Sequence, residues 1–462
     1  MGLVEVVLEY ITVKSVIVFA VVAWWLWVAV KRFDESIRLR RLAPGTRGQS
    51  LNAHLPGGID FVFKAVRGAM SHKNVDFWLD MLSKVKGWTG EKRILGLRIV
   101  FTAEPENIKA ILATQFSDYG KGEPFHREWH EFLGDSIFTT DGDQWHASRQ
   151  LIRPQFVKDR VSDLQCFEAH IQTLFKTIAN GGALDGEDQV VNMDADGKVM
   201  DISELFFRYT LDVATDFLLG EDVKSLTTIK QEFAEAFNEV QRVQNILARA
   251  AKLKPFVPLF TFRAGLKLVA VLLAGRDTTA STLSWTIYEL GRHPEVVRKL
   301  RAEIIEQVGL NREPTYADLK SMKYLQNVMN ETLRLYPVVP FNVRLALKDT
   351  TLPVGGGPDG TLPLAVCKDT PIGYSTLLMQ RREDLYPPPW TYVPFNGGPR
   401  ICIGQQFALT EMGYTLCRLF QRFERVESFM DEIDGGKPLL KAEIVLQPGD
   451  GVKVAFYKGK DE

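Results

Sequence analysis

A single cysteine stands in a glycine-rich stretch, Phe395-Asn396-Gly397-Gly398-Pro399-Arg400-Ile401-Cys402-Ile403-Gly404. Apolar residues then recur at helical spacing from Leu409 to Phe423, which predicts an amphipathic helix directly after the cysteine. A thiol at a helix start lies near the positive end of the helix dipole, which favours the thiolate. A thiolate can ligate a haem iron and push electron density onto it, which favours O–O cleavage. The stretch therefore predicts Cys402 as an iron ligand.

The residues that frame Cys402 suit the same role. Gly398 permits a tight turn, and Gly404 lets a flat macrocycle approach the backbone. Arg400 offers a guanidinium to a haem propionate. The alternative is an inert buried cysteine in a turn, but Phe395 and the other framing residues in register favour the ligand.

A second candidate is Ala274-Gly275-Arg276-Asp277-Thr278-Thr279, which follows an apolar run that predicts a helix. A threonine in a helix can bond the carbonyl four residues earlier and open the ladder locally, which makes room for dioxygen. Asp277 and Thr278 supply an acid and an alcohol, the groups that relay protons to reduced oxygen. The competing interpretation is a helix N-cap or surface turn, where Asp and Thr are common.

Two further pairs have helical spacing. Trp145 and Arg149 lie four apart on one face and offer an indole N–H and a guanidinium to a carboxylate. Glu331 and Arg334 lie three apart, where a buried pair must satisfy its donors and acceptors. The plainer interpretations are a core tryptophan with an exposed arginine, and a solvated surface pair.

Composition narrows the class of protein. The chain has 462 residues, 45% of them hydrophobic and 24% charged, which are globular values. The net charge of -1 and the absence of a dense basic run argue against nucleic acid as a partner. The four cysteines are widely spaced without a C-x-x-C pair, which suits a reducing compartment and disfavours zinc bound by cysteines.

The N-terminal region predicts a membrane anchor. Residues 15–30 contain no charge, and as a helix they would span about 24 Å, which reaches a thin membrane when extended back through Ile11. Basic residues follow from Lys31, so the positive-inside rule places the rest of the chain in the cytosol. A cleaved signal peptide is the alternative, but its charges would lie on the other side.

The remaining pattern indicates one mixed domain. Residues 46–330 read mainly as helices with a short strand near 98–101, and residues 341–400 read as strands and turns. The glycine-rich segment 353–360 has no following Lys-Ser/Thr, which predicts a wide turn between strands and not a phosphate loop. We expect a mainly α fold with a small β portion. Its parts are a membrane anchor (1–30), a basic Pro/Gly linker (31–60) and one globular domain (61–462).

Taken together, these motifs resemble the cytochrome P-450 superfamily over nearly the whole chain. The resemblance implies the cytochrome P-450 fold, haem b as the cofactor and Cys402 as its thiolate ligand. It places Trp145, Arg149, Arg344 and Arg400 at propionate-binding positions, and Phe395 and Gly404 in the cofactor loop. It also makes Asp277 and Thr278 the proton-delivery pair, and Glu331 and Arg334 a structural pair.

The motifs most resemble those of fungal microsomal members that hydroxylate n-alkanes and fatty acids. This implies a monooxygenase that inserts one atom of O2 into a C–H bond of a small hydrophobic substrate. Electrons would come from an NADPH-cytochrome reductase containing two flavins, with cytochrome b5 as an optional second partner. The resemblance places the enzyme in the endoplasmic reticulum membrane as a single-pass protein with a cytosolic catalytic domain.

Two regions are shorter than the family pattern. The family carries an aromatic-Pro-Glu-Arg-Phe block before the cysteine loop, and residues 381–394 contain no such block. Its arginine would complete a triad with Glu331 and Arg334. Little helix fits between Ala251 and Leu268, where the family has lid helices over the substrate. Two alternatives therefore stay open: a non-catalytic truncated isoform, and a haem-thiolate isomerase or dehydratase that needs no reductase.

Overall fold

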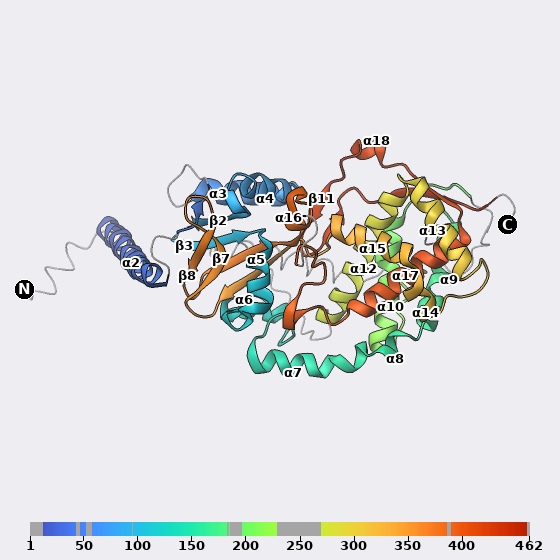
Figure 1. Cartoon of the computed structure of the whole chain (residues 1–462), viewed down its shortest axis with the longest axis horizontal. Helices are drawn as coiled ribbons and strands as arrows, with labels where there is room; N and C mark the ends of the chain where they lie inside the picture. The colour runs from blue at the N-terminus through green and yellow to red at the C-terminus, as the bar shows by residue number, and fades with distance from the viewer. Residues whose placement is uncertain are drawn as a thin grey trace, which may run out of the picture.

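A computed structural model describes residues 13–42, 47–51, 58–94, 96–182, 184, 196–228, 269–385 and 390–459. A sheet-rich part and a larger helical part lie side by side, and helix α2 projects away from both (Figure 1). The predicted mainly α fold with a small β portion is confirmed. The helices are α2 (Val13–Leu42), α3 (Ile59–Met70), α4 (Asn74–Leu82), α5 (Pro105–Lys109), α6 (Gly122–Leu133), α7 (Gly142–Ile152), α8 (Lys158–Val161), α9 (Gln165–Ala179), α10 (Ile202–Leu219), α12 (Val269–Leu290), α13 (Pro294–Gln307), α14 (Tyr316–Ser321), α15 (Lys323–Leu335), α16 (Thr376–Gln380), α17 (Gln405–Arg422) and α18 (Asp431–Asp434).

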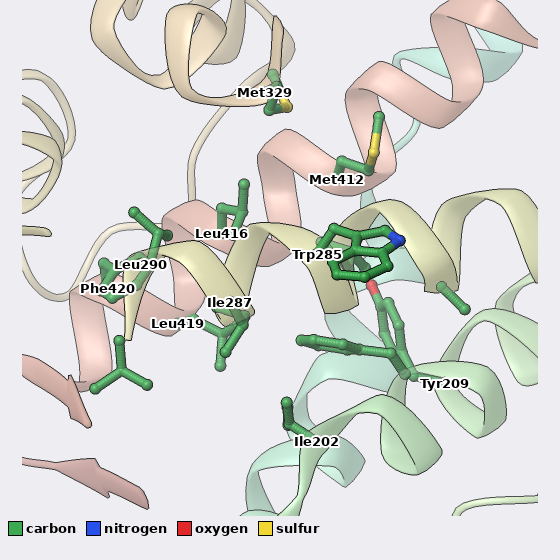
Figure 2. Close-up of a cluster of buried hydrophobic side chains, with 14 of the residues drawn as sticks. Ile202, Tyr209, Trp285, Ile287, Leu290, Met329, Met412, Leu416, Leu419 and Phe420 are labelled. Carbon is green, nitrogen blue, oxygen red and sulfur yellow. The ribbon is translucent and has the colours of Figure 1, made fainter. Parts of the chain in front are cut away.

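The helical part is built around α12, which packs against α10, α15 and α17. Figure 2 shows side chains from α10, α12 and α17 that meet around Trp285. The Trp285 ring stacks on Tyr336 with 4.1 Å between ring centroids, and its indole N–H donates to the Leu446 carbonyl at 3.0 Å. Buried hydroxyls in this helix donate to carbonyls one turn earlier, as Ser284 does to Ala280 at 2.7 Å. A helix buried on several faces can therefore carry many polar residues with their hydrogen bonds made, although the buried Ser281 hydroxyl has no partner among the described residues.

The sheet-rich part contains a six-stranded sheet in the order β1-β2-β3-β9-β6-β4. Strands β1–β2 and β3–β9 pair in parallel, and β2–β3, β6–β9 and β4–β6 pair antiparallel. A second apolar core forms on this sheet from residues such as Val100, Ile372 and Tyr374. The strands are β1 (Gln49–Ser50), β2 (Thr89–Ile94), β3 (Leu97–Thr102), β4 (Tyr119–Gly120), β5 (Met200–Asp201), β6 (Phe341–Ala346), β7 (Thr350–Gly356), β8 (Leu362–Val366), β9 (Pro371–Ser375), β10 (Arg425–Ser428), β11 (Leu440–Ala442), β12 (Leu446–Pro448) and β13 (Lys453–Tyr457).

Several local predictions are confirmed. The strand expected near residues 98–101 is β3. The glycine-rich segment 353–360 lies at the end of β7 and in the turn to β8, and these two strands form an antiparallel hairpin with an irregular register. The helix expected after the cysteine is α17, and its apolar residues Met412, Leu416, Leu419 and Phe420 are buried.

Helix α2 differs at its two ends. Its C-terminal half is docked on the globular body, because Leu39 is buried, Arg38 pairs with Asp349 at 3.2 Å and Glu35 pairs with Arg93 at 2.7 Å. Its first half carries exposed apolar side chains such as Phe19 and Trp25. Residues 31–42, expected in the linker, continue this helix, and the linker residues 43–45 lie outside the described residues. Within the part of the chain that the structure describes, no helix is long and apolar enough to cross a membrane.

Candidate active site

Cys402 lies in the loop that leads into α17, as the sequence predicts. Its amide donates to the Phe395 carbonyl at 3.0 Å, which closes the loop across the motif. The Gly404 amide donates to the Cys402 sulfur, and α17 begins one residue later at Gln405. The sulfur therefore lies at the N-terminus of a helix with a backbone N–H directed at it, an arrangement that stabilises a negative sulfur.

The protonation of Cys402 differs from the prediction of a favoured thiolate. Desolvation raises the pKa of the Cys402 thiol, and this effect outweighs the lowering by the Gly404 amide and the Arg149 guanidinium. The residue nevertheless keeps an exposed surface. Burial thus opposes the thiolate, and a metal cation bound at the sulfur would favour it.

The glycines of the loop serve two separate purposes. Gly398 has a φ of 64°, and an added Cβ would lie 1.9 Å from the Leu112 carbonyl oxygen, so only glycine fits. At Gly404 an added Cβ would meet Phe156 at an ordinary 3.5 Å. The protein's own packing therefore does not require glycine at Gly404, and the approach of a flat macrocycle there stays a prediction.

Arg400 is the centre of a buried polar cluster. Its Nη2 donates to the Thr140 carbonyl at 2.9 Å and to the Asp141 carboxylate at 2.5 Å, and its guanidinium lies 4.7 Å from the centroid of the Trp145 ring. Its Nε and Nη1 atoms are buried without a hydrogen-bond partner. Buried donors of this kind cost free energy unless a ligand accepts from them, so an anionic group fits here.

Three more cations approach Arg400 from different elements. Arg344 of β6 is buried and donates to Asn342 Oδ1 at 2.8 Å, and Lys121, just before α6, donates to the same oxygen at 3.3 Å. Arg149 of α7 is close enough to lower the pKa of Arg400.

The pKa values in this cation cluster (Lys121, Arg149, Arg344 and Arg400) show how crowded its positive charge is. Burial lowers the pKa of Arg400 to about 10 against the raising effect of Asp141, and Arg344 and Arg149 lower it further. Burial lowers the pKa of Lys121 well below its usual value, and Arg344 and Arg400 lower it again. A ligand with two carboxylates, such as a haem with its propionates, would relieve this repulsion and fits the cluster.

Sequence reasoning missed Lys121 and Asp141. The Asp141 carboxylate accepts from the amides of Lys121 and Gly122 at 2.9 and 2.7 Å, and it pairs with Arg400. An added Cβ at Gly120 would lie 2.8 Å from this carboxylate. The one available signal was the Gly-Lys-Gly run at 120–122, whose first glycine, Gly120, leaves room for the aspartate.

Asp277 and Thr278 lie inside α12, which excludes the N-cap interpretation of that motif. The Thr278 hydroxyl donates to the Ala274 carbonyl at 2.5 Å, the local interaction that the sequence predicts. Asp277 is buried, and its carboxylate lies 3.6 Å from the Nε atom of Arg276. Arg276 thus lies beside the Asp277 carboxylate, and the Thr278 hydroxyl is hydrogen-bonded within α12 itself.

Glu331 and Arg334 form a two-pronged ion pair on α15 with N···O distances of 2.7 and 2.6 Å. Their side chains are 55% and 36% exposed, so the pair is hydrated and not buried. The desolvation cost expected for a buried pair that lacks its third partner therefore does not apply. Residues 386–389, within the segment expected to brace the loop, lie outside the described residues.

Comparisons with known proteins agree on one family. Residues 70–267 and 266–449 match the family model described as Cytochrome P450. The cytochrome P450 monooxygenase pvhE of Talaromyces variabilis is 50% identical, with 94% of each chain covered. Cytochrome P450 52A13 of Debaryomyces hansenii is 35% identical over 86% of this chain and 89% of its own. The heme domain of a cytochrome P450DA mutant has the same fold at a TM-score of 0.69, with 18% identity and coverage of 90% of this chain and 98% of that domain.

The same comparisons bear on the shortened regions. The alignment with the Talaromyces protein is 509 positions long, whereas the whole chain has 462 residues. That relative therefore carries segments opposite gaps in this chain. The family match is also divided into two ranges that meet at residues 266–267, within the region between Ala251 and Leu268 where little helix was expected to fit.

We expect Asp141→Asn to destabilise the protein by about 3 kcal/mol, because it leaves the buried Arg400 guanidinium without its counter-charge. Urea unfolding of the haem-free protein measures the change. Asp80→Asn is the control, since the Asp80–Lys84 pair is exposed and should change stability by less than about 1 kcal/mol. Equal effects of the two substitutions would show that Asp141 does not offset buried charge.

Proposed function

The chain belongs to the cytochrome P450 family, and we propose that this haem-dependent monooxygenase binds haem b through the Cys402 thiolate beside α17. The observation that carries this proposal is Arg400, whose buried Nε and Nη1 atoms have no partner although Arg344 and Lys121 crowd the same place. When bound, the haem supplies the activation of O2 and the insertion of one oxygen atom into a C–H bond.

Each residue of the site has a proposed task. Arg149, Arg344 and Arg400 donate hydrogen bonds to the propionates, and Lys121 adds positive charge to the same region. Trp145 lies against the Arg400 guanidinium and fixes its plane. Phe395 and Gly398 hold the cysteine loop in place, and Gly404 leaves room for the macrocycle.

The proton-delivery pair acts from α12. Because the Thr278 hydroxyl hydrogen points at the Ala274 carbonyl, its oxygen is free to accept a hydrogen bond from a water. Asp277 is the acid that replenishes the proton, and it must turn from Arg276 to do so. Arg276 therefore holds the acid in its resting position.

We propose an n-alkane or fatty acid as the substrate, on the resemblance of the cysteine loop and the Ala274–Thr279 motif to fungal alkane hydroxylases. Electrons would come from an NADPH-cytochrome reductase, with cytochrome b5 as an optional second donor. The gaps against the Talaromyces relative favour one rival, a chain that does not retain haem. A carbon-monoxide difference spectrum separates the haem-binding enzyme from this haem-free rival.

We expect the expressed protein to show the red-shifted Soret band of a thiolate-ligated haem–CO complex, and Cys402→Ser to abolish it. The measurement is a reduced carbon-monoxide difference spectrum. Cys166→Ser is the control, since Cys166 lies on α9 and serine can keep its hydrogen bond to Asp216 of α10. A wild-type protein without this band would overturn the enzyme proposal and support the haem-free rival.

For proton delivery, we expect Thr278→Ala to lower product formed per NADPH consumed by about tenfold and to release hydrogen peroxide instead. Thr282→Ala is a matched control, because Thr282 lies one turn later on α12 and bonds the Thr278 carbonyl at 2.9 Å in the same way. Product, NADPH and peroxide are measured together. Equal losses in both variants would indicate a helix defect. Hydroperoxide turnover without NADPH would favour the isomerase or dehydratase.

We also propose that the N-terminal region anchors the enzyme in the endoplasmic reticulum membrane with the catalytic domain in the cytosol. The exposed apolar half of α2 and the basic residues after Val30 support this.

We expect Phe19→Lys with Trp25→Lys to weaken co-sedimentation with phospholipid vesicles, because each lysine costs about 3 kcal/mol at a bilayer centre. Phe33→Lys, beyond the apolar stretch, should still sediment; a wild-type protein that stays in the supernatant contradicts the proposal.

A further inference from the structure

We propose that His126, His130 and Asp135 form a binding site for a divalent transition metal of the zinc type. The two histidines lie one turn apart on α6, and Asp135 follows directly after Gly134, the residue that ends this helix. This site is separate from the cysteine loop, and the proposal does not depend on haem binding.

The three ligand atoms converge on one point. Asp135 Oδ1 lies 2.8 Å from Nε2 of His126 and 3.5 Å from Nε2 of His130, and the two imidazole centroids are 5.0 Å apart. Ligands bound tetrahedrally to zinc at about 2.0–2.1 Å lie about 3.3 Å from one another. The observed separations lie on either side of that value, so small side-chain rotations would admit the ion.

A hydrogen-bonded cluster accounts for only part of this arrangement. His126 is within hydrogen-bond distance of Asp135, but the His130 contact at 3.5 Å is longer than the usual N–H···O range. A metal would engage all three groups at once. The exposed Glu123 carboxylate lies 4.0 Å from Nδ1 of His126, too far for a hydrogen bond in the present arrangement.

A second cluster shows the contrast. Cys166 and His170 both contact Asp216 Oδ2, at 3.5 and 3.0 Å. The His170 side chain is only 7% exposed, so an ion from solvent has little access to it. The Cys166 and His170 contacts with Asp216 are accounted for by hydrogen bonds. At the α6 site the ligands are imidazoles, and their side chains are 29% and 49% exposed, so an ion can reach them.

The donor set determines the class of metal. Two neutral imidazoles and one carboxylate leave a fourth position for water, the composition of many open zinc sites. Magnesium and calcium prefer oxygen ligands and would bind poorly. The ion would also fix the end of α6 relative to α7, because the Asp135 carbonyl accepts from the Ser148 hydroxyl at 3.1 Å and α7 carries Trp145 and Arg149.

Equilibrium dialysis of the full-length haem-loaded protein against Zn²⁺, followed by metal analysis, tests this site. We expect one Zn²⁺ per chain that is retained in a competing excess of Mg²⁺. His130→Gln should weaken Zn²⁺ binding by more than about tenfold, because loss of an outer-shell group alone typically costs about 10–100-fold. Asp135→Asn should weaken it as well. His72→Asn is the control, since His72 has a φ of 54° that asparagine tolerates and lies outside the cluster.

Thermal unfolding gives a second, independent measurement. Zn²⁺ should raise the unfolding temperature of the wild type and of His72→Asn, and it should leave that of His130→Gln unchanged. Circular dichroism shows whether each variant is folded. Zinc binding that is the same in wild type and both cluster variants, or no zinc bound to the wild type, would overturn the proposal.

Discussion

The structure depends on one electrostatic constraint, which is that four cations, of which Arg149 is the least buried, lie close together with Asp141 as their nearby carboxylate. Each cation comes from a different element: Lys121 precedes α6, Arg149 lies on α7, Arg344 on β6 and Arg400 in the cysteine loop. Holding like charges together in a low-dielectric place is costly, and the rest of the fold must be rigid enough to sustain it. A ligand with two carboxylates would turn this cost into binding free energy.

The rigidity comes from the way α12 is buried. It packs against helices on several sides, yet it carries buried serines and threonines together with Asp277. Hydroxyls that bond carbonyls one turn earlier let the helix remain both buried and polar. Thr210 of α10 adds support by donating to the Arg276 carbonyl at 2.9 Å, so the region around Asp277 is held from a second helix. Function and stability therefore use the same polar groups.

The sequence predicted what depends on local pattern. The helix after Cys402, the hairpin around residues 350–366 and the helical context of Asp277 and Thr278 follow from periodicity and turn residues. Three features could not be read in this way because they depend on tertiary surroundings. Nothing in the sequence distinguishes Lys121 from a surface lysine, because its burial beside Asp141 and Arg344 arises only in the folded protein. The direction of the Cys402 pKa is decided by how much protein surrounds the sulfur. The Glu331–Arg334 pair has the spacing of a buried motif but is hydrated here.

The contact between Gly398 and the Leu112 carbonyl also bears on the order of assembly. These residues are far apart along the chain, so the cysteine loop reaches its final shape only after the sheet-rich N-terminal portion has docked against the C-terminal portion. Contacts of such long sequence separation form late in folding, since the entropy of closing the intervening chain must be offset first. A chain still being synthesised therefore presents neither a finished ligand loop nor a complete set of cations. Cofactor capture is consequently an event of the completed polypeptide.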